Sequence, residues 1–290
     1  MSILLSSSHR VHIGKISIGN HLPFCLIAGI NVLDHMDLNH RVASTLVEIC
    51  TSLKIPLVFK ASFDKANRSG IESPRGPGLL KGLAFLKELK EEYQFPILTD
   101  IHEPRQATLV ADVVDCIQIP AFLCRQTDLI KAACEVERPL HIKKMQMMSP
   151  NEMRSVLDKC LYFGQDQVIL CERGTLFGYN QLIVDPLSIP HMKTWHAPIS
   201  FDVTHALQQP GALGTQTGGR SQWTEALARA SVSQGLAALF IETHPNPSEA
   251  LCDGPCAWPL HQMKDLLFRL KSLDEWAKSF VECPKEECRD

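Results

Sequence analysis

The sequence alternates short apolar runs with stretches of helical spacing, and this alternation restricts the fold more than any other feature. Each run has the length and nearly unbroken apolar character of a strand buried on both faces, which is typical of parallel sheets. Eight runs occur, and they cover residues 24–31, 56–62, 96–103, 116–122, 140–146, 168–174, 199–205 and 238–245.

Between most of the runs, apolar residues recur at the spacing of an amphipathic helix. In residues 35–53, Val42, Leu46, Cys50 and Leu53 follow one another at steps of three or four positions. Residues 179–195 contain two prolines and predict irregular structure. Helices are predicted within residues 35–53, 79–93, 126–137, 149–163, 224–234 and 259–280.

A strand followed by a helix, repeated eight times, predicts an α/β protein with one (β/α)8 barrel domain over residues 1–290. A doubly wound open sheet is the alternative, and we favour the barrel because no glycine-rich dinucleotide turn follows the first run. Period-two alternation around Gly14 and Lys15 predicts a β-hairpin at about residues 10–20, which we expect to close the amino end of the barrel. The barrel itself is expected at about residues 24–280, followed by a short C-terminal tail.

Composition and charge argue against nucleic acid or a membrane as the partner. The 29 Lys and Arg against 32 Asp and Glu leave a net charge of −3, unlike proteins that coat polyanions. The eleven cysteines form no CxxC pair, the first residues are too polar for a signal peptide, and no apolar run is long enough for a membrane span. We therefore expect a cytoplasmic protein with reduced, structural thiols.

The expected barrel gathers cations at one end, because the carboxyl ends of its strands form one mouth. Lys60, Lys143 and Arg173 lie within or directly after apolar runs. A buried charge at such a position costs free energy unless it is paired, which indicates a role in binding. Lys65 and Arg68 follow Lys60 in the next loop. This cationic mouth suits a ligand that carries phosphate and carboxylate groups.

Carboxylates and an imidazole lie at the same end. Asp100, His205, Glu242 and Asp253 can transfer protons. A His, a Glu and an Asp with one soft ligand would equally form a divalent metal site, so the residues alone leave both open. The glycine-rich residues 211–220 after the seventh run are expected to form either a lid or a flexible connector.

Motifs at these strand ends resemble those of one enzyme family. Residues 60–69, KASFDKANRS, followed by RGPG at 75–78, resemble the signature of the 3-deoxy-D-manno-octulosonate 8-phosphate synthases. The resemblance implies a transferase that condenses phosphoenolpyruvate with D-arabinose 5-phosphate and water, releasing phosphate, in the biosynthesis of the lipopolysaccharide sugar Kdo. Further motifs agree, namely TDIHE at 99–103, QIPAFLCRQTD at 118–128, FDVTH at 201–205, FIETHP at 240–245 and CDGP at 252–255.

The resemblance also implies which residues bind the two substrates. One group holds the carboxylate of phosphoenolpyruvate, a second holds its phosphate, and a third holds the sugar phosphate. These groups are, in that order, Lys60, Ser62 and Lys65; Gln118, the backbone of Ala121, Lys143 and Arg173; and Asn67, Arg68, Ser69 and Asp100.

Catalytic roles and an oligomer are implied in the same way. Arg125 resembles an arginine that reaches the sugar phosphate of a neighbouring subunit, so a homotetramer is expected. Lys65 is expected to protonate the alkoxide that forms from the aldehyde. The water that attacks phosphoenolpyruvate is expected to be organised by Asn31, His205, Glu242 and Asp253.

The identity of residue 31, an asparagine, determines whether we expect the protein to bind a metal ion. The family has two branches, and in the metal-dependent one a cysteine at the end of the first strand joins a His, a Glu and an Asp around a divalent ion. Here Asn31 stands at that position, and a neutral amide binds soft or borderline metals far more weakly than a thiolate. Cys25 lies six residues earlier, roughly 20 Å along an extended chain, so it cannot substitute. Cys252 adjoins Asp253 and is the nearest other thiol, but the resemblance implies that this Cys-Asp-Gly also occurs in metal-free members, so it is discounted. We therefore expect no metal and no other cofactor.

Two alternative functions stay open. One is another phosphoenolpyruvate-dependent synthase, for precursors of shikimate or sialic acid. The other is a catalytically inactive barrel that senses sugar phosphates, although no matched lysine or arginine is substituted and both His205 and Glu242 are present.

Overall fold

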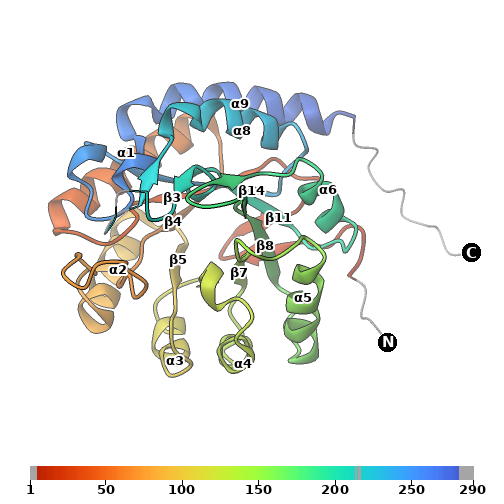
Figure 1. The fold of residues 1–290 in the computed structure, drawn as a ribbon, viewed down its shortest axis with the longest axis horizontal. Helices are drawn as coiled ribbons and strands as arrows, with labels where there is room; N and C mark the ends of the chain where they lie inside the picture. Colours follow the sequence, from red (N-terminus) through yellow and green to blue (C-terminus); the bar gives the residue numbers. More distant parts are fainter. Residues whose placement is uncertain (1–4, 213, 215–216, 281–290) are drawn as a thin grey trace, which may run out of the picture.

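A computed structural model describes residues 5–212, 214 and 217–280, so the predicted tail from residue 281 lies outside the described residues, as do three positions of the glycine-rich segment. The parallel strands close into a barrel because β14 pairs with both β11 and β3 (Figure 1). This closure excludes the open sheet and confirms the predicted (β/α)8 barrel. The barrel strands are β3 (Cys25–Gly29), β4 (Leu57–Lys60), β5 (Ile97–Asp100), β6 (Cys116–Ile119), β7 (Leu140–Lys143), β8 (Val168–Glu172), β11 (Ile199–Asp202) and β14 (Ala238–His244).

Helices surround the strands, with α1, α8 and α9 on one side of Figure 1 and α2 to α5 on the other. Neither α3 (Gln106–Ala111) nor α7 (Val203–Ala206) was predicted, because six and four residues give too few positions for a periodic pattern. Helix α7 begins within the apolar run 199–205, so that strand ends earlier than predicted. The prediction of irregular structure over residues 179–195 was wrong in part, because they contain β10 and α6. The remaining helices are α1 (Met36–Leu53), α2 (Leu79–Tyr93), α4 (Thr127–Glu135), α5 (Glu152–Tyr162), α6 (Ser188–Lys193), α8 (Thr224–Val232) and α9 (Met263–Lys278).

Short elements complete the loops around the barrel. Strand β9 (Thr175–Leu176) pairs with β10 (Leu182–Ile183), β12 (Gln208–Gln209) pairs with β13 (Gly218–Gly219), and β15 (Trp258–Pro259) pairs in parallel with the end of β14. Five 3-10 turns are present in the described residues: η1 (Ala121–Leu123), η2 (Ser221–Trp223), η3 (Pro247–Glu249), η4 (Gly254–Cys256) and η5 (Leu260–Gln262). No helix in the described part of the chain has the length and apolar character needed to cross a bilayer.

The predicted hairpin closes the amino end of the barrel. Strands β1 (Val11–Ile13) and β2 (Ile16–Ile18) pair antiparallel, and Gly14 makes the turn with a φ of 56°, which glycine adopts without a steric penalty. Val11, Ile13 and Ile18 are fully buried against apolar side chains from the barrel strands. The hairpin is therefore an apolar floor beneath the barrel interior.

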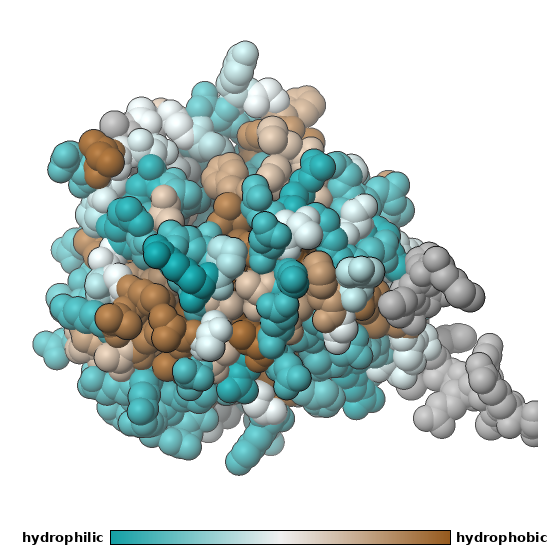
Figure 2. All heavy atoms as spheres, turned by 90° about the horizontal axis from the view of Figure 1, so that it is seen from below, coloured by the Kyte–Doolittle hydropathy of each residue, from teal (hydrophilic) through white to brown (hydrophobic). Residues whose placement is uncertain are grey.

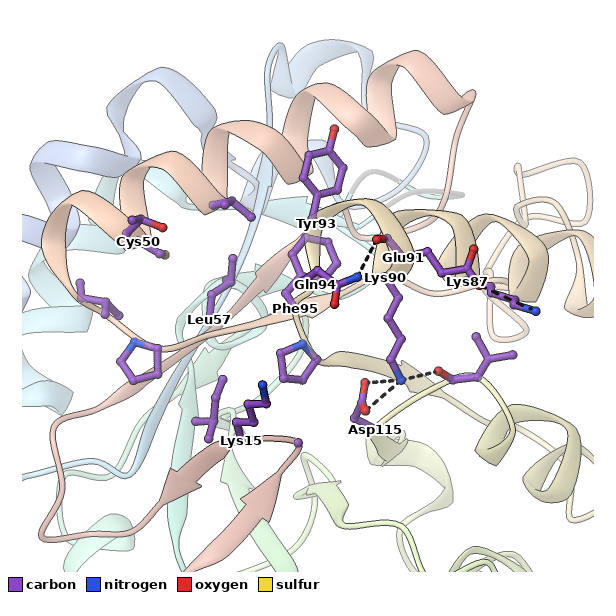
Figure 3. A pocket seen from close by; sticks show the side chains of 18 of the residues that line it. Lys15, Cys50, Leu57, Lys87, Lys90, Glu91, Tyr93, Gln94, Phe95 and Asp115 are labelled. Carbon is purple, nitrogen blue, oxygen red and sulfur yellow. Dashed lines mark hydrogen bonds and ion pairs between the residues drawn. The ribbon is translucent and has the colours of Figure 1, made fainter.

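A large open groove lies beside this hairpin, at the amino ends of β4 and β5. It has a volume of about 960 Å³ and runs between the hairpin turn, the ends of α1 and α2, and the starts of the two strands (Figure 3). The Lys90 side chain lines one wall of this groove. Its ammonium donates to Val113 O at 3.0 Å and to Asp115 Oδ1 at 2.9 Å. None of the residues predicted to bind substrate lines it.

Candidate active site

Lys60 is the central cation at the carboxyl end of the barrel. Its side chain is 1% exposed, and Nζ donates to Glu242 Oε1 at 3.1 Å, Ser62 Oγ at 3.0 Å and Asn31 O at 3.3 Å. Burial and repulsion by Lys65 lower the pKa of Lys60, and the neighbouring carboxylates oppose that shift. The site therefore holds a buried ammonium that contacts its own strand end through Ser62 and two other strand ends through Asn31 and Glu242.

Asp100 joins Lys60 from the next strand. The Ser62 hydroxyl donates to its Oδ1, and His102 Nε2 lies 3.0 Å from its Oδ2. Burial alone would raise the pKa of Asp100, but Lys60 and the hydrogen bond from His102 hold it well below its usual range. Asp100 is therefore a carboxylate at neutral pH, tied to the residues predicted to hold phosphoenolpyruvate.

On the opposite side of the mouth, Asp202 joins a lysine to a histidine. Its Oδ2 accepts from Lys143 Nζ and lies 2.7 Å from His205 Nδ1, while its Oδ1 caps α7 by accepting from His205 N at 2.9 Å. Burial would raise the pKa of Asp202, but His205 and Lys143 hold it well below its usual range. The buried carboxylate thus fixes the positions of both partners.

Three acid and imidazole groups meet beside Asn31. The side chains of His205, Glu242 and Asp253 bring one nitrogen and two oxygens within 4.8 Å of one another. Asn31 Nδ2 donates to Asp253 Oδ2 at 2.8 Å. Within the described residues, Asn31 Oδ1 and Glu242 Oε2 are buried acceptors without a hydrogen-bond partner. Such a cluster can hold a water molecule between two acceptors and an imidazole.

Arg173 places a partly unsatisfied guanidinium in the mouth. It is 4% exposed; Nη2 donates to Gln208 Oε1 at 2.7 Å, and Nη1 is buried without a partner among the described residues. Burial lowers the pKa of Arg173. A buried cationic donor without a partner is costly, and an anionic ligand would satisfy it.

Gln118 lies on the same side, at the end of β6. Its Oε1 is 3.1 Å from His141 Nδ1, in the barrel interior. The backbone of Ala121 follows at the start of η1. The residues predicted to bind the phosphate of phosphoenolpyruvate therefore lie at the ends of β6, β7 and β8, which are neighbours in the barrel.

The sequence matches the DAHP synthetase I family over residues 3–279. The chain belongs to this family. A 2-dehydro-3-deoxyphosphooctonate aldolase of Acinetobacter baylyi is 54% identical over 276 residues, which are 95% of this chain and 97% of the relative. Proteins of the same name from Psychromonas ingrahamii and Hahella chejuensis are 52% and 51% identical, over 93% and 94% of this chain and 96% and 98% of their own. The family membership indicated by the motifs is therefore confirmed.

The loop after β4 carries the remaining predicted residues of this family member. Burial would lower the pKa of Lys65, but the carboxylates of Glu242 and Asp100 outweigh it and raise the pKa. Arg68 donates to Cys252 Sγ, at the edge of the mouth. Asn67 and Ser69 are exposed and have no side-chain hydrogen bond to any described residue, so the structure does not bring them into the cluster.

Arg125 lies apart from the mouth of its own subunit. Its side chain is 65% exposed, and Nη1 lies 3.8 Å from Glu152 Oε1 on α5. No described residue of the mouth contacts it. A role for Arg125 in this subunit's site is therefore not supported, and its role in a neighbour stays a prediction.

Sequence reasoning missed four residues of the site. Asp202, His102 and Gln208 each hold a predicted residue in place, and Phe240 lies beneath Lys143, whose Nζ is 3.1 Å from the ring centroid. A signal existed for Asp202, because it ends the seventh apolar run and precedes His205 by one helical turn. Gln208 carried none, since it lies in a polar loop.

Proposed function

We propose that the protein condenses phosphoenolpyruvate with D-arabinose 5-phosphate and water to give 3-deoxy-D-manno-octulosonate 8-phosphate and inorganic phosphate, a step of Kdo biosynthesis. The cationic mouth carries the proposal, because Lys60, Lys143 and Arg173 are all at least 96% buried at the strand ends. The relatives' name denotes the same octulosonate phosphate chemistry. Two phosphates and one carboxylate are the charges that such a mouth would neutralise.

The reaction needs charge control at two carbons. The double bond of phosphoenolpyruvate attacks the aldehyde carbon with its C3, so the aldehyde oxygen becomes an alkoxide and C2 becomes electron-poor. Water adds at C2 and loses a proton, and the resulting hemiketal phosphate collapses and expels phosphate. Holding both substrates in one mouth supplies proximity, and the fixed cations stabilise the charges that develop.

Lys65 is the proposed donor to the alkoxide. Its raised pKa keeps it protonated at neutral pH, and an alkoxide is basic enough to take that proton. The attacking water is placed between Asn31 Oδ1, Glu242 Oε2 and His205, because neither oxygen accepts a hydrogen bond in the described chain and His205 Nε2 lies 3.5 Å from Glu242 Oε2. Asp253 holds the Asn31 amide in position.

Phosphate release tests the function. The purified protein is expected to release phosphate only when both substrates are present. Erythrose 4-phosphate and N-acetylmannosamine, offered in place of arabinose 5-phosphate, are expected to give far lower rates. Binding of both substrates without release would instead support the inactive sensor.

The reaction is also proposed to need no metal ion. The cluster of His205, Glu242 and Asp253 is joined by the neutral Asn31 amide in place of a thiolate, and the Lys60 ammonium donates to Glu242. The nearest thiol, Cys252, lies outside this cluster and donates to Asp253 Oδ2 at 3.1 Å. Full activity is expected after exhaustive dialysis against a chelator, with no gain from manganese, zinc or cadmium. Asn31→Cys is expected to create metal binding. Loss of turnover on chelation and its return with a divalent metal would refute this.

We further propose a homotetramer in which Arg125 serves a neighbour's sugar-phosphate site. Exposed apolar side chains support a subunit contact on the side of α2 to α5, where Figure 2 shows hydrophobic patches among hydrophilic residues; Leu109, Phe122 and Tyr162 are 46%, 55% and 81% exposed. Arg125→Ala is expected to raise the KM for arabinose 5-phosphate far more than that for phosphoenolpyruvate. Mixed oligomers with Lys143→Ala are expected to regain activity, and equal KM effects without complementation would contradict a shared site.

A cytoplasmic location is part of the same proposal. Nine cysteines among the described residues are free and buried, as expected for a reducing compartment. Cell fractionation with an antibody against the protein checks the location.

A further inference from the structure

A fully buried histidine lies beneath the phosphate side of the mouth and has no part in the reaction described above. His141 is in β7, where the register places it beside Gln118 of β6. The side chain is 0% exposed, and its ring stacks on Phe240 with 5.8 Å between centroids and 8° between planes. A polar ring at this depth depends on its hydrogen-bond partners.

Two hydrogen bonds hold this ring, and the one to the Gln118 amide oxygen sets its tautomer. Nδ1 lies 3.1 Å from Gln118 Oε1, and Nε2 lies 2.8 Å from Ser200 Oγ. Burial and the charge of Lys143 hold the pKa of His141 well below its usual range, so the ring is neutral and carries one N–H. Because an amide oxygen only accepts, Nδ1 carries the proton and Nε2 accepts from the Ser200 hydroxyl.

The same hydrogen bond determines which end of the Gln118 amide is available. The oxygen is bound to His141, while the NH2 group has no hydrogen-bond partner in the described part of the chain. The reverse orientation would pair the NH2 group with the ring and leave the carbonyl oxygen free. A free oxygen would repel an anion drawn to Lys143 and Arg173, whereas a free NH2 group donates to it.

We propose that His141 is a positioning residue, which holds Gln118 with its NH2 group available to the phosphate of phosphoenolpyruvate, while the Ser200 hydroxyl satisfies the other ring nitrogen. The proposal rests on the proposed function, since it takes phosphoenolpyruvate as the ligand. His141 itself is sealed inside the barrel and acts only through Gln118. His141 is therefore expected to contribute to the binding of phosphoenolpyruvate and not to that of arabinose 5-phosphate.

A double-mutant cycle tests this dependence on Gln118. His141→Leu removes the donor and is expected to raise the KM for phosphoenolpyruvate about tenfold, with that for arabinose 5-phosphate changed less than about twofold. In a Gln118→Ala background the same change is expected to add nothing, because no amide remains to be oriented. His141→Asn, whose NH2 group can replace Nδ1–H, is expected to bring the KM back towards that of the unmodified enzyme.

Two results would overturn the proposal. One is an equal effect of His141→Leu on both substrates, and the other is its full effect persisting in the Gln118→Ala background. Either would make His141 a packing residue only.

Binding of inorganic phosphate, measured by calorimetry, separates this proposal from the proposed function. If the unmodified protein binds phosphate but releases none from the two substrates, the function fails, while weaker phosphate binding by His141→Leu still supports the positioning role. Where His141→Leu does not fold, His141→Phe decides, since its ring can keep the stacking on Phe240 but has no N–H. Phosphate binding weaker than in the unmodified protein supports the proposal, and equal binding overturns it.

Discussion

The two ends of this barrel differ in the side chains that they bury, which are apolar at the amino end and charged at the carboxyl end. At the amino end, Val11, Ile13 and Ile18 of the hairpin fill the interior with apolar side chains. At the carboxyl end, the barrel strands carry buried charges such as Lys60 and Lys143, which form ion pairs with buried carboxylates. Apolar burial stabilises the fold, whereas buried charge costs free energy unless it is compensated. Stability and chemistry are thus assigned to different ends of the same strands.

The largest expected effect comes from removing a charge at the carboxyl end. Arg173→Met is expected to lower kcat/KM at least about 100-fold, because a buried cation for the phosphate is lost. The free energy of unfolding is expected to change by less than about 1 kcal/mol, because the lost bond from Nη2 to Gln208 is offset by removing a buried cation whose Nη1 has no hydrogen-bond partner among the described residues. Phosphate-release kinetics and urea unfolding measure the two effects.

Lys15→Met is the matched control at the amino end. Lys15 lies exposed in the hairpin turn, so both quantities are expected to stay unchanged. A loss of stability in Arg173→Met as large as its loss of activity would break the division between the two ends.

The second effect is expected at the amino end, where a substitution should lower the free energy of unfolding and leave kcat/KM unchanged. Ile18→Ala removes a fully buried side chain from the floor and is expected to lower the free energy of unfolding by about 2–4 kcal/mol. The kcat/KM at a temperature where the variant stays folded is expected to match the unmodified enzyme. Ser17→Ala, on the neighbouring position of β2, is expected to cost less than about 0.5 kcal/mol. A change in kcat/KM with Ile18→Ala would show that the floor supports the mouth.

The smallest effect is a pH dependence from the carboxyl end. The pKa values of Asp100 and Asp202 are depressed in the folded state, so their stabilising contribution is present above the unfolded value of about 4 and is lost as the pH falls below it. Urea unfolding between pH 6 and pH 2 is expected to show this loss. Asp202→Asn is expected to be less stable at pH 6 but to lose less on acidification. An unchanged acid slope in that variant would contradict the assignment.

Much of this division could be predicted from the sequence. Apolar runs that end in polar residues predict both the barrel and the side of it that carries Lys60, Lys143 and Arg173. Period-two alternation around Gly14 predicts the hairpin. These features are local patterns, so a single sequence contains them.

Partners across strands could not be predicted in the same way. Asn31 and Asp253 are 222 positions apart, and only the closed barrel shows that one donates to the other. The roles of His141 and Asp202 depend on strand register and on rotamers, which no short pattern encodes. The family resemblance supplied the matched positions but not the residues that hold them.

Barrel closure through β3 and β14 also has a consequence for synthesis on the ribosome. Roughly 210 residues separate Gly29 from Ala238, so at about 5–20 residues per second β3 waits on the order of 10–40 s for its second neighbour. During that time one edge of a wholly apolar strand offers unpaired N–H and C=O groups to any other nascent chain. We expect newly made chains to need a chaperone over this interval, and the first barrel strand to be where they aggregate when none is available.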